Sequence, residues 1–153
     1  MPDVRARLVE LGVPLPQVNP PKGVYLPAVR TGSVVHIAGQ VPMVAGEVVR
    51  TGRVGAEVTV EEAAALGRGC VLSALAAVAA VAELDSIVRV VRVAGYVASA
   101  PGFDRQFEVV AAANVFLAAV LGPDRGGVCT AVGVPDLPLR VPIELEITVQ
   151  LAD

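Results

Sequence analysis

The feature that most constrains the fold is the strict alternation near the C-terminus, in "PIELEITVQL", residues 142–151. Apolar side chains occupy every second position, and Glu, Thr or Gln fills the positions between them. Because successive side chains of a strand point to opposite faces of a sheet, this pattern predicts a strand with one buried face and one polar face. The polar face carries Glu144 and Glu146, which either meet solvent or belong to a site.

Four further strands are predicted from β-branched residues and alternation. They are "YLPAVRTG" (25–32) and "SVVHIAGQV" (33–41), joined as a hairpin through Thr31-Gly32, then "SIVRVVRVAGYVAS" (86–99) and "VCTAVGV" (128–134). The segment "EVVRTGRVG" (47–55) is a candidate for a short additional strand.

The clearest helix lies within residues 58–85, where Thr59 followed by Glu62 forms a capping box. Small residues dominate this helix, so we expect a sheet to pack closely against it. A second helix lies within residues 99–123 and ends at Gly122-Pro123. A shorter helix is predicted from Val4 to Leu11.

Strands interrupted by helices, with every helix needed on one side of the sheet, predict an α+β sandwich. The 153 residues are expected to form a single domain, 1–153. The chain is 54% hydrophobic, with a mean hydropathy of +0.66. The uncharged stretch of the main helix, residues 69–82, is shorter than the roughly 18–20 residues that cross a bilayer. Burial between subunits therefore explains the apolar excess better than a membrane does.

Several function classes are disfavoured by composition. The net charge of −3 and the scattered basic residues argue against a nucleic-acid surface. His36 is the only histidine, so no metal site is expected, and it is interpreted as a structural residue of its strand. Cys70 and Cys129 cannot form a disulfide framework and fit a reducing, cytoplasmic location. Cys70 is interpreted as core packing. The N-terminus is not typical of a signal peptide.

Four segments together resemble one known family. They are "YLPAVRTGSVVHIAGQVP", "GRVGAEVTVEEAAALGRGCVLSALAAV", "VVRVAGYVASAPGF" and "AVGVPDLPLRVPIELE". They are similar, in unbroken order from about Leu11 to Leu151, to the RidA family (YjgF/YER057c/UK114), also labelled endoribonuclease L-PSP. The resemblance is strongest to the branch whose members have about this length.

The resemblance implies a chorismate-mutase-like fold, with a mixed sheet backed by two main helices. It also implies a homotrimer with a central barrel-like core and small-molecule clefts between subunits. The best-known activity of the family is hydrolysis of enamines and imines, such as 2-aminoacrylate, to a 2-keto acid and ammonia. That reaction needs no metal or organic cofactor. The ligand class implied for this chain is a 2-imino or 2-keto acid.

Position by position, the resemblance assigns catalytic roles to Glu144 and Tyr25. The glutamate would position or activate water, and the tyrosine would help to close the cleft. Gly39 matches a cleft glycine, and Ala38 stands where the family commonly has serine.

The family's carboxylate-binding arginine has no counterpart in this register. Fifteen residues before Glu144 stands Cys129, followed by Thr130 in place of the usual serine. Arg125 would reach the site only by a different path of its loop, and Arg140 is expected at the rim. An asparagine that the family often supplies from the second helix falls on Ala111, with Asn114 one turn further along.

Three interpretations of Cys129 remain open. The thiol could be an apolar filler in an altered cleft, or part of a site for a neutral or differently charged ligand. It could also be a nucleophile, which would need a nearby cation or helix N-terminus. Two function hypotheses follow. The first is a cofactor-free imine or enamine hydrolase with altered activity or substrate. The second is a non-catalytic small-molecule-binding or chaperone-like trimer.

Overall fold

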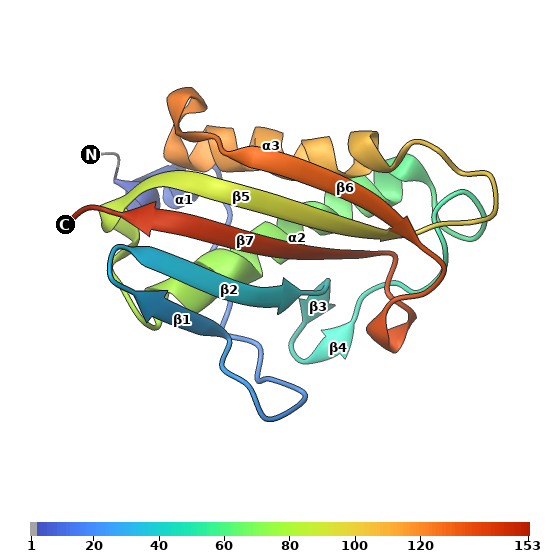
Figure 1. Cartoon of the computed structure of the whole chain (residues 1–153), viewed down its shortest axis with the longest axis horizontal. Helices are drawn as coiled ribbons and strands as arrows, with labels where there is room; N and C mark the ends of the chain where they lie inside the picture. Colours follow the sequence, from blue (N-terminus) through green and yellow to red (C-terminus); the bar gives the residue numbers. More distant parts are fainter. Residues whose placement is uncertain (1–2) are drawn as a thin grey trace.

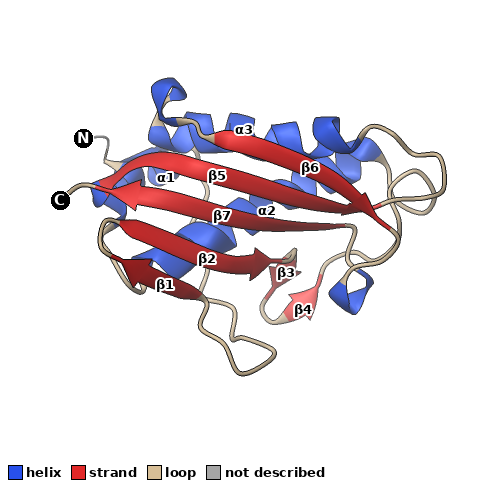
Figure 2. Ribbon diagram, in the orientation of Figure 1, coloured by secondary structure: helices blue, strands red, loops and turns tan. Residues whose placement is uncertain are grey.

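A computed structural model describes residues 3–153 as one layer of sheet with helices packed on one face (Figures 1 and 2). The helices are α1 (Val4–Glu10), α2 (Val60–Ala79) and α3 (Gln106–Leu121). The strands of the main sheet are β1 (Ala28–Thr31), β2 (Val34–Gln40), β5 (Ile87–Ala98), β6 (Val128–Val134) and β7 (Ile143–Leu151). Figure 1 looks onto the uncovered face of this sheet, which we call the open face.

The strand order is β1-β2-β7-β5-β6, so β5 lies between β7 and β6. The pairs β1-β2, β2-β7 and β5-β7 are antiparallel, and β5-β6 is parallel. Parallel pairing requires a long crossover connection, and α3 provides it. The sheet is therefore mixed and the architecture is α+β, as the sequence predicts.

The residues of β7 that face the helices form the centre of the core. They are at most 3% exposed, and they are Ile143, Leu145, Ile147, Val149 and Leu151. Alternation in the sequence thus becomes alternation in burial, and the residues between these five lie on the open face.

The capping box of α2 forms as predicted. The backbone N–H of Glu62 donates to the Thr59 hydroxyl at 3.1 Å, and the Thr59 N–H donates to the Glu62 carboxylate at 2.8 Å. By length and composition α2 is apolar enough to cross a membrane, and 56% of that window is buried within the chain, as in a core helix. Cys70 on α2 is fully buried, which confirms its interpretation as core.

The third helix approaches β5 closely at a glycine. A Cβ atom at Gly95 would collide with the side chain of Val110 on α3. The missing side chain lets the helix lie close to the strand, and this position tolerates no larger residue without a shift of α3.

Two local predictions need correction. Residues 47–55 do not form a strand of the main sheet: β4 spans only Glu47–Val48 and pairs with β3 (Met43–Val44) in a separate hairpin. Val54 makes only isolated bridges. The first hairpin turns at Gly32-Ser33, one residue later than predicted, because Thr31 pairs with Val34. Gly32 has a φ of 59°, which glycine adopts without strain.

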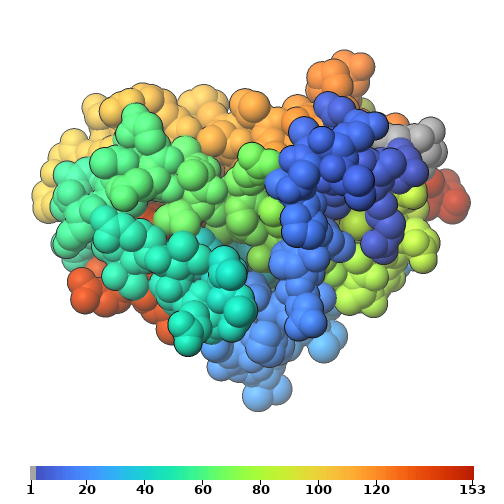
Figure 3. Space-filling model, turned by 180° about the vertical axis from the view of Figure 1, so that it is seen from behind, coloured from blue at the N-terminus to red at the C-terminus, as the bar shows by residue number. Residues whose placement is uncertain are grey.

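The segment between α1 and β1 crosses the helix-covered side of the molecule (blue in Figure 3). The amide of Asn19 donates to the Ser73 hydroxyl of α2 at 3.3 Å, which ties this segment to the helix. The segment ends in the loop that carries Tyr25. Three consecutive apolar residues of this loop are exposed: Val24, Tyr25 and Leu26.

Candidate functional site

Glu144 lies at the start of β7, on the open face, and is half-buried. A Cβ atom at Gly39 would overlap the Glu144 carboxylate oxygen, so the carboxylate rests directly over the Cα of Gly39. This contact requires glycine at position 39. Burial, followed by the nearby Glu146 carboxylate, raises the pKa of the Glu144 carboxyl above its usual value.

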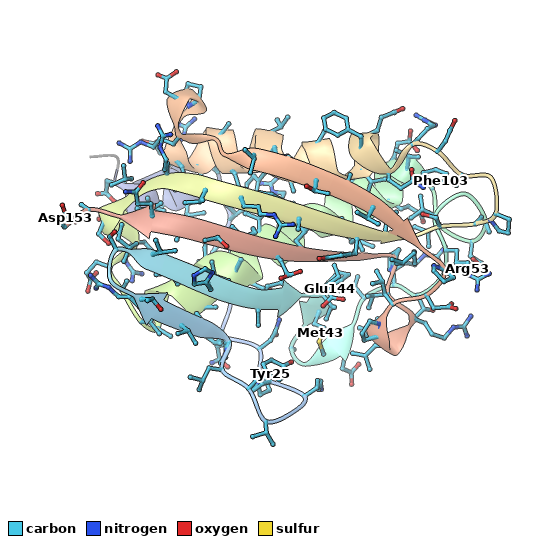
Figure 4. The ribbon with its side chains drawn as sticks, in the orientation of Figure 1. Tyr25, Met43, Arg53, Phe103, Glu144 and Asp153 are labelled. Carbon is cyan, nitrogen blue, oxygen red and sulfur yellow. The ribbon has the colours of Figure 1, made fainter. Side chains whose placement is uncertain are left out.

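Tyr25 approaches the same end of the sheet from the loop before β1. Figure 4 shows Tyr25, Met43 and Glu144 beside the C-terminal end of β2. Tyr25, Ala38 and Gly39 line one small cavity of about 40 Å³. The Tyr25 ring is 51% exposed, and its hydroxyl accepts a hydrogen bond from the Lys22 N–H at 3.3 Å.

The structure therefore brings together four of the seven predicted site residues, which we call the glutamate half-site: Tyr25, Ala38, Gly39 and Glu144. The distortion of β2 explains part of this grouping. The pairing of β2 with β7 shifts register between Ile37 and Gln40, so Ala38 and Gly39 together occupy a bulge. Bulges redirect side chains and are frequent near functional sites.

Cys129, on β6, lies apart from the glutamate half-site. It packs against the hydrophobic core with Ala131, so both face the helices. Cys129 and Glu144 thus lie on opposite faces of the sheet, on strands separated by β5. With adjacent strands about 4.8 Å apart, two strand spacings separate β6 from β7. One chain alone does not assemble the predicted cleft.

Around Cys129 there is a second, separate cavity of about 130 Å³, which we call the cysteine half-site. Cys129, Asn114 and Arg125 line it. The Asn114 amide donates to the Cys129 sulfur at 3.1 Å. Arg125 does share this cavity, but its guanidinium donates to the Ile87 carbonyl at 2.7 Å, at the beginning of β5. In this structure the arginine therefore anchors its own turn.

Thr130, the last predicted site residue, is exposed and points to the open face, opposite to Cys129. Arg140 is also exposed, as predicted, and has a φ of 57°. Its carbonyl accepts a hydrogen bond from the Gly52 N–H at 2.9 Å. Neither residue lines the glutamate half-site or the cysteine half-site.

Residues 5–125 match the model of the YjgF/chorismate mutase-like family, described as "putative endoribonuclease". The chain belongs to this family. The resemblance seen in the sequence to RidA/YjgF proteins is confirmed, and so is the fold it implies. Among curated proteins, "Protein TCP17" of Trypanosoma cruzi is 35% identical over 150 residues, covering 97% of this chain and 94% of that protein.

Two solved structures illustrate the likeness within the YjgF family. The Agrobacterium tumefaciens protein Atu1372, described as of unknown function, is 35% identical with a TM-score of 0.87, covering 97% of this chain and 92% of that one. A Shewanella oneidensis "putative endoribonuclease" is 27% identical with a TM-score of 0.91, covering 97% and 99%. Both superpose along nearly the whole chain, so the family assignment extends past residue 125.

Tyr96, on the open face, escaped the sequence analysis. Tyr96 on β5 pairs directly with Glu144 on β7, and its hydroxyl donates to the Glu146 carboxylate at 2.6 Å. The alternation of β7 indicated that Glu144 and Glu146 share a face. The pairing of β5 with β7 was not visible in the sequence, because these strands are separated by α3 and β6.

Proposed function

We propose that this YjgF-family chain is a cofactor-free hydrolase of small imines or enamines, in which Glu144 transfers protons at a site completed by a second copy of the chain. The observation that carries the proposal is the Glu144 carboxylate. It is half-buried over Gly39, and the side-chain hydrogen bonds of residues 3–153 include one to the Glu146 carboxylate but none to the Glu144 carboxylate. A desolvated carboxylate with free oxygens is suited to bind and activate a water molecule.

The proposed reaction uses water as its only co-reactant. An enamine such as 2-aminoacrylate first becomes its imine tautomer. Glu144 takes a proton from water as the oxygen attacks the imine carbon, and the C=N electron pair moves to nitrogen, which is protonated. The resulting carbinolamine loses ammonia as its hydroxyl becomes a carbonyl, and Glu144 shuttles the proton. The products are a 2-keto acid and ammonia.

Completion by a second copy is supported by the surface of the chain. The edge strand β6 carries no charged residue, and Val128 and Val132 are 67% and 41% exposed. Exposed apolar strand edges favour pairing or burial against another chain. The exposed apolar loop at Val24–Leu26 adds further surface of this kind. We propose a homotrimer in which the glutamate half-site of one copy faces the cysteine half-site of its neighbour.

The substitution at position 129 alters what such a composite site recognises. A bidentate arginine clamp is the strongest neutral-pH grip on a carboxylate, and a thiol cannot replace it. The guanidinium of Arg125 is directed to the Ile87 carbonyl instead. We therefore expect weak binding of carboxylate substrates. A nucleophilic role for Cys129 is not favoured, because the Arg125 guanidinium in the same cavity is directed to the Ile87 carbonyl and His36 lies on a different strand at the open face.

One observation favours the second candidate function, a non-catalytic small-molecule-binding trimer. In the cysteine half-site, a cavity of about 130 Å³, the Arg125 guanidinium is held by the Ile87 carbonyl and the Asn114 amide contacts a thiol, which suits a neutral ligand. Ribonuclease activity, suggested by the names of relatives, is not proposed, because the chain has a net charge of −3. The two free cysteines support a reducing compartment such as the cytosol as our proposal for its location.

The test is release of pyruvate and ammonia from freshly generated 2-aminoacrylate. We expect slow hydrolysis by the wild type, a gain in Cys129→Arg through a lower KM, and a loss of about 100-fold in Glu144→Gln. Glu83→Gln, which changes an exposed carboxylate far from either half-site, is the matched control. If Glu144→Gln hydrolyses 2-aminoacrylate as fast as the wild type does, the hydrolase proposal is rejected. Sedimentation showing a monomer would reject the composite site.

A further inference from the structure

The open face holds a hydrogen-bonded pair beside Glu144 that the proposed reaction does not use. Tyr96 and Glu144 are cross-strand partners, yet the Tyr96 hydroxyl donates to Glu146, one step further along the same face of β7. The bond is 2.6 Å long, which is typical of a hydroxyl donating to a charged carboxylate. Two carboxyl groups thus share one face of a strand, and among the side-chain hydrogen bonds of residues 3–153 only the Glu146 carboxylate has a donor.

This asymmetry separates the two glutamates. Glu146 is exposed, and its carboxylate accepts the tyrosine hydroxyl. Glu144 is half-buried over Gly39, and burial disfavours its ionised form. A fixed negative charge at Glu146 acts in the same direction on Glu144. Pairs of titratable groups whose environments differ in this way mark the division into acid–base group and fixed charge.

We propose that Tyr96 and Glu146 are positioning residues for Glu144: the tyrosine hydroxyl holds the Glu146 carboxylate in place on the face that it shares with Glu144, and this arrangement makes Glu144 the carboxyl group that accepts and returns protons. Tyr96 touches Glu146, and Glu146 acts through Glu144. The proposal rests on the proposed role of Glu144 in catalysis, and its structural part can be tested without any substrate.

Other ionisable groups around Glu144 do not supply the same charge. On β5, Arg92 faces the same side, but it pairs across from Thr148, and no ion pair within 4.0 Å joins it to Glu146 among residues 3–153. On β2, His36 also pairs across from Thr148, at the open face. From the loop, Tyr25 lines the cavity at Gly39. Behind the sheet, burial and then Glu144 raise the pKa of the Cys70 thiol, which keeps it neutral.

The consequence for catalysis is a better match of Glu144 to neutral pH. A general base works best when its pKa lies near the operating pH, and an ordinary glutamate titrates far below it, at about 4.3. Burial over Gly39 raises the pKa of Glu144, and the charge of Glu146 raises it further. Without either positioning residue the site would still form, but the proton affinity of Glu144 would match neutral pH less well.

The experiment follows the titration of glutamate side-chain carboxyl carbons by NMR in the full chain. Glu144→Gln assigns the signal of Glu144, and Glu83 serves as an exposed reference in the same spectra. In Glu146→Gln we expect the midpoint of Glu144 to fall, because the neighbouring charge is removed. In Tyr96→Phe we expect the midpoint of Glu144 to fall by a smaller amount, because the hydrogen bond that holds the Glu146 carboxylate is lost. An unchanged Glu144 midpoint in both variants would overturn the proposal.

Activity gives a second, separable result. In Glu146→Gln we expect kcat at pH 7 to fall roughly threefold to tenfold, a fraction of the 10²–10⁴ that a positioned acid–base group supplies, with KM unchanged. The acid limb of the kcat–pH profile should move to lower pH. An unshifted limb in an active variant would overturn the role of Glu146. If no protein in the series hydrolyses 2-aminoacrylate, the proposed function fails while the titration still decides the positioning.

Discussion

On β7, the side chains facing the helices are at most 3% exposed, whereas those of the opposite face, from Glu144 to Gln150, all reach solvent to some degree. Both sets come from one nine-residue strand. The helix-covered face is apolar and closely packed. The open face carries two carboxylates, a tyrosine–glutamate hydrogen bond and the contact of Glu144 with Gly39. The comparison teaches that one strand here supplies stability on one side and chemistry on the other.

The two cysteines refine this comparison, because both lie on the helix-covered side. Cys70 is fully buried in α2, and burial raises the pKa of its thiol. Cys129 is only half-buried and borders a cavity shared with Asn114. The covered side is therefore not uniformly closed, and Cys129 on β6 borders its opening.

The largest expected effect is a loss of stability from a substitution on the helix-covered face. Leu145→Ala should lower the free energy of unfolding by about 3 kcal/mol, because a fully buried leucine leaves a cavity. Gln150→Ala, on the open face of the same strand, should change it by less than about 0.5 kcal/mol. Urea unfolding of both variants measures the difference. Equal losses would mean that the open face also contributes core packing.

The next largest effect is a loss of activity from a substitution on the open face that leaves the core unchanged. In Gly39→Ala the new Cβ must displace the Glu144 carboxylate, so hydrolysis should fall about as far as in Glu144→Gln, roughly 100-fold. Gly69→Ala is the matched control. No atom lies within 4 Å of the Cβ it adds, and in a helix the change should stabilise by about 0.5–1 kcal/mol. An unaltered NMR titration of Glu144 in Gly39→Ala would contradict the contact.

The smallest expected effect is the pH dependence of stability that comes from Glu144. Because the folded chain raises the pKa of Glu144, it binds that proton more tightly than the unfolded chain does. Ionising Glu144 therefore costs stability as pH rises from the ordinary glutamate value, about 4.3, through the raised folded value. Glu144→Gln removes this cost and should be more stable than the wild type at neutral pH.

The measurement is thermal unfolding of the wild type and Glu144→Gln across that range. We expect their difference in stability to shrink as pH falls, and Glu83→Gln is measured alongside as a substitution at an exposed glutamate. A difference that grows toward low pH would mean that the native state favours the charged form of Glu144.

Much of the fold follows from local sequence. The alternation of residues 142–151, the capping box at Thr59 and the stop at Gly122-Pro123 are short-range signals, and the structure shows each of them as predicted. Residues 47–55 were a candidate for a short additional strand. The structure has only Glu47–Val48 in a strand there, and it pairs with Met43–Val44 in a separate hairpin.

The candidate site was harder to predict from the sequence than the fold was. The sequence pointed to Tyr25, Gly39 and Glu144 through the family resemblance, and the structure brings these three together. It also suggested that Cys129 shares their cleft. That grouping does not occur within one chain, because β5 separates β6 from β7 and the two side chains face opposite sides.

The sequence by itself determined which elements form, which face of each is apolar, and which family the chain belongs to. These properties depend on neighbours a few residues apart, where periodicity and capping act. Only the tertiary structure decided that Tyr96 stands across from Glu144, that Gly39 lies beneath its carboxylate, and that Cys129 belongs to a separate half-site. Strand order and register set these contacts, and they are fixed by packing between residues far apart in the chain.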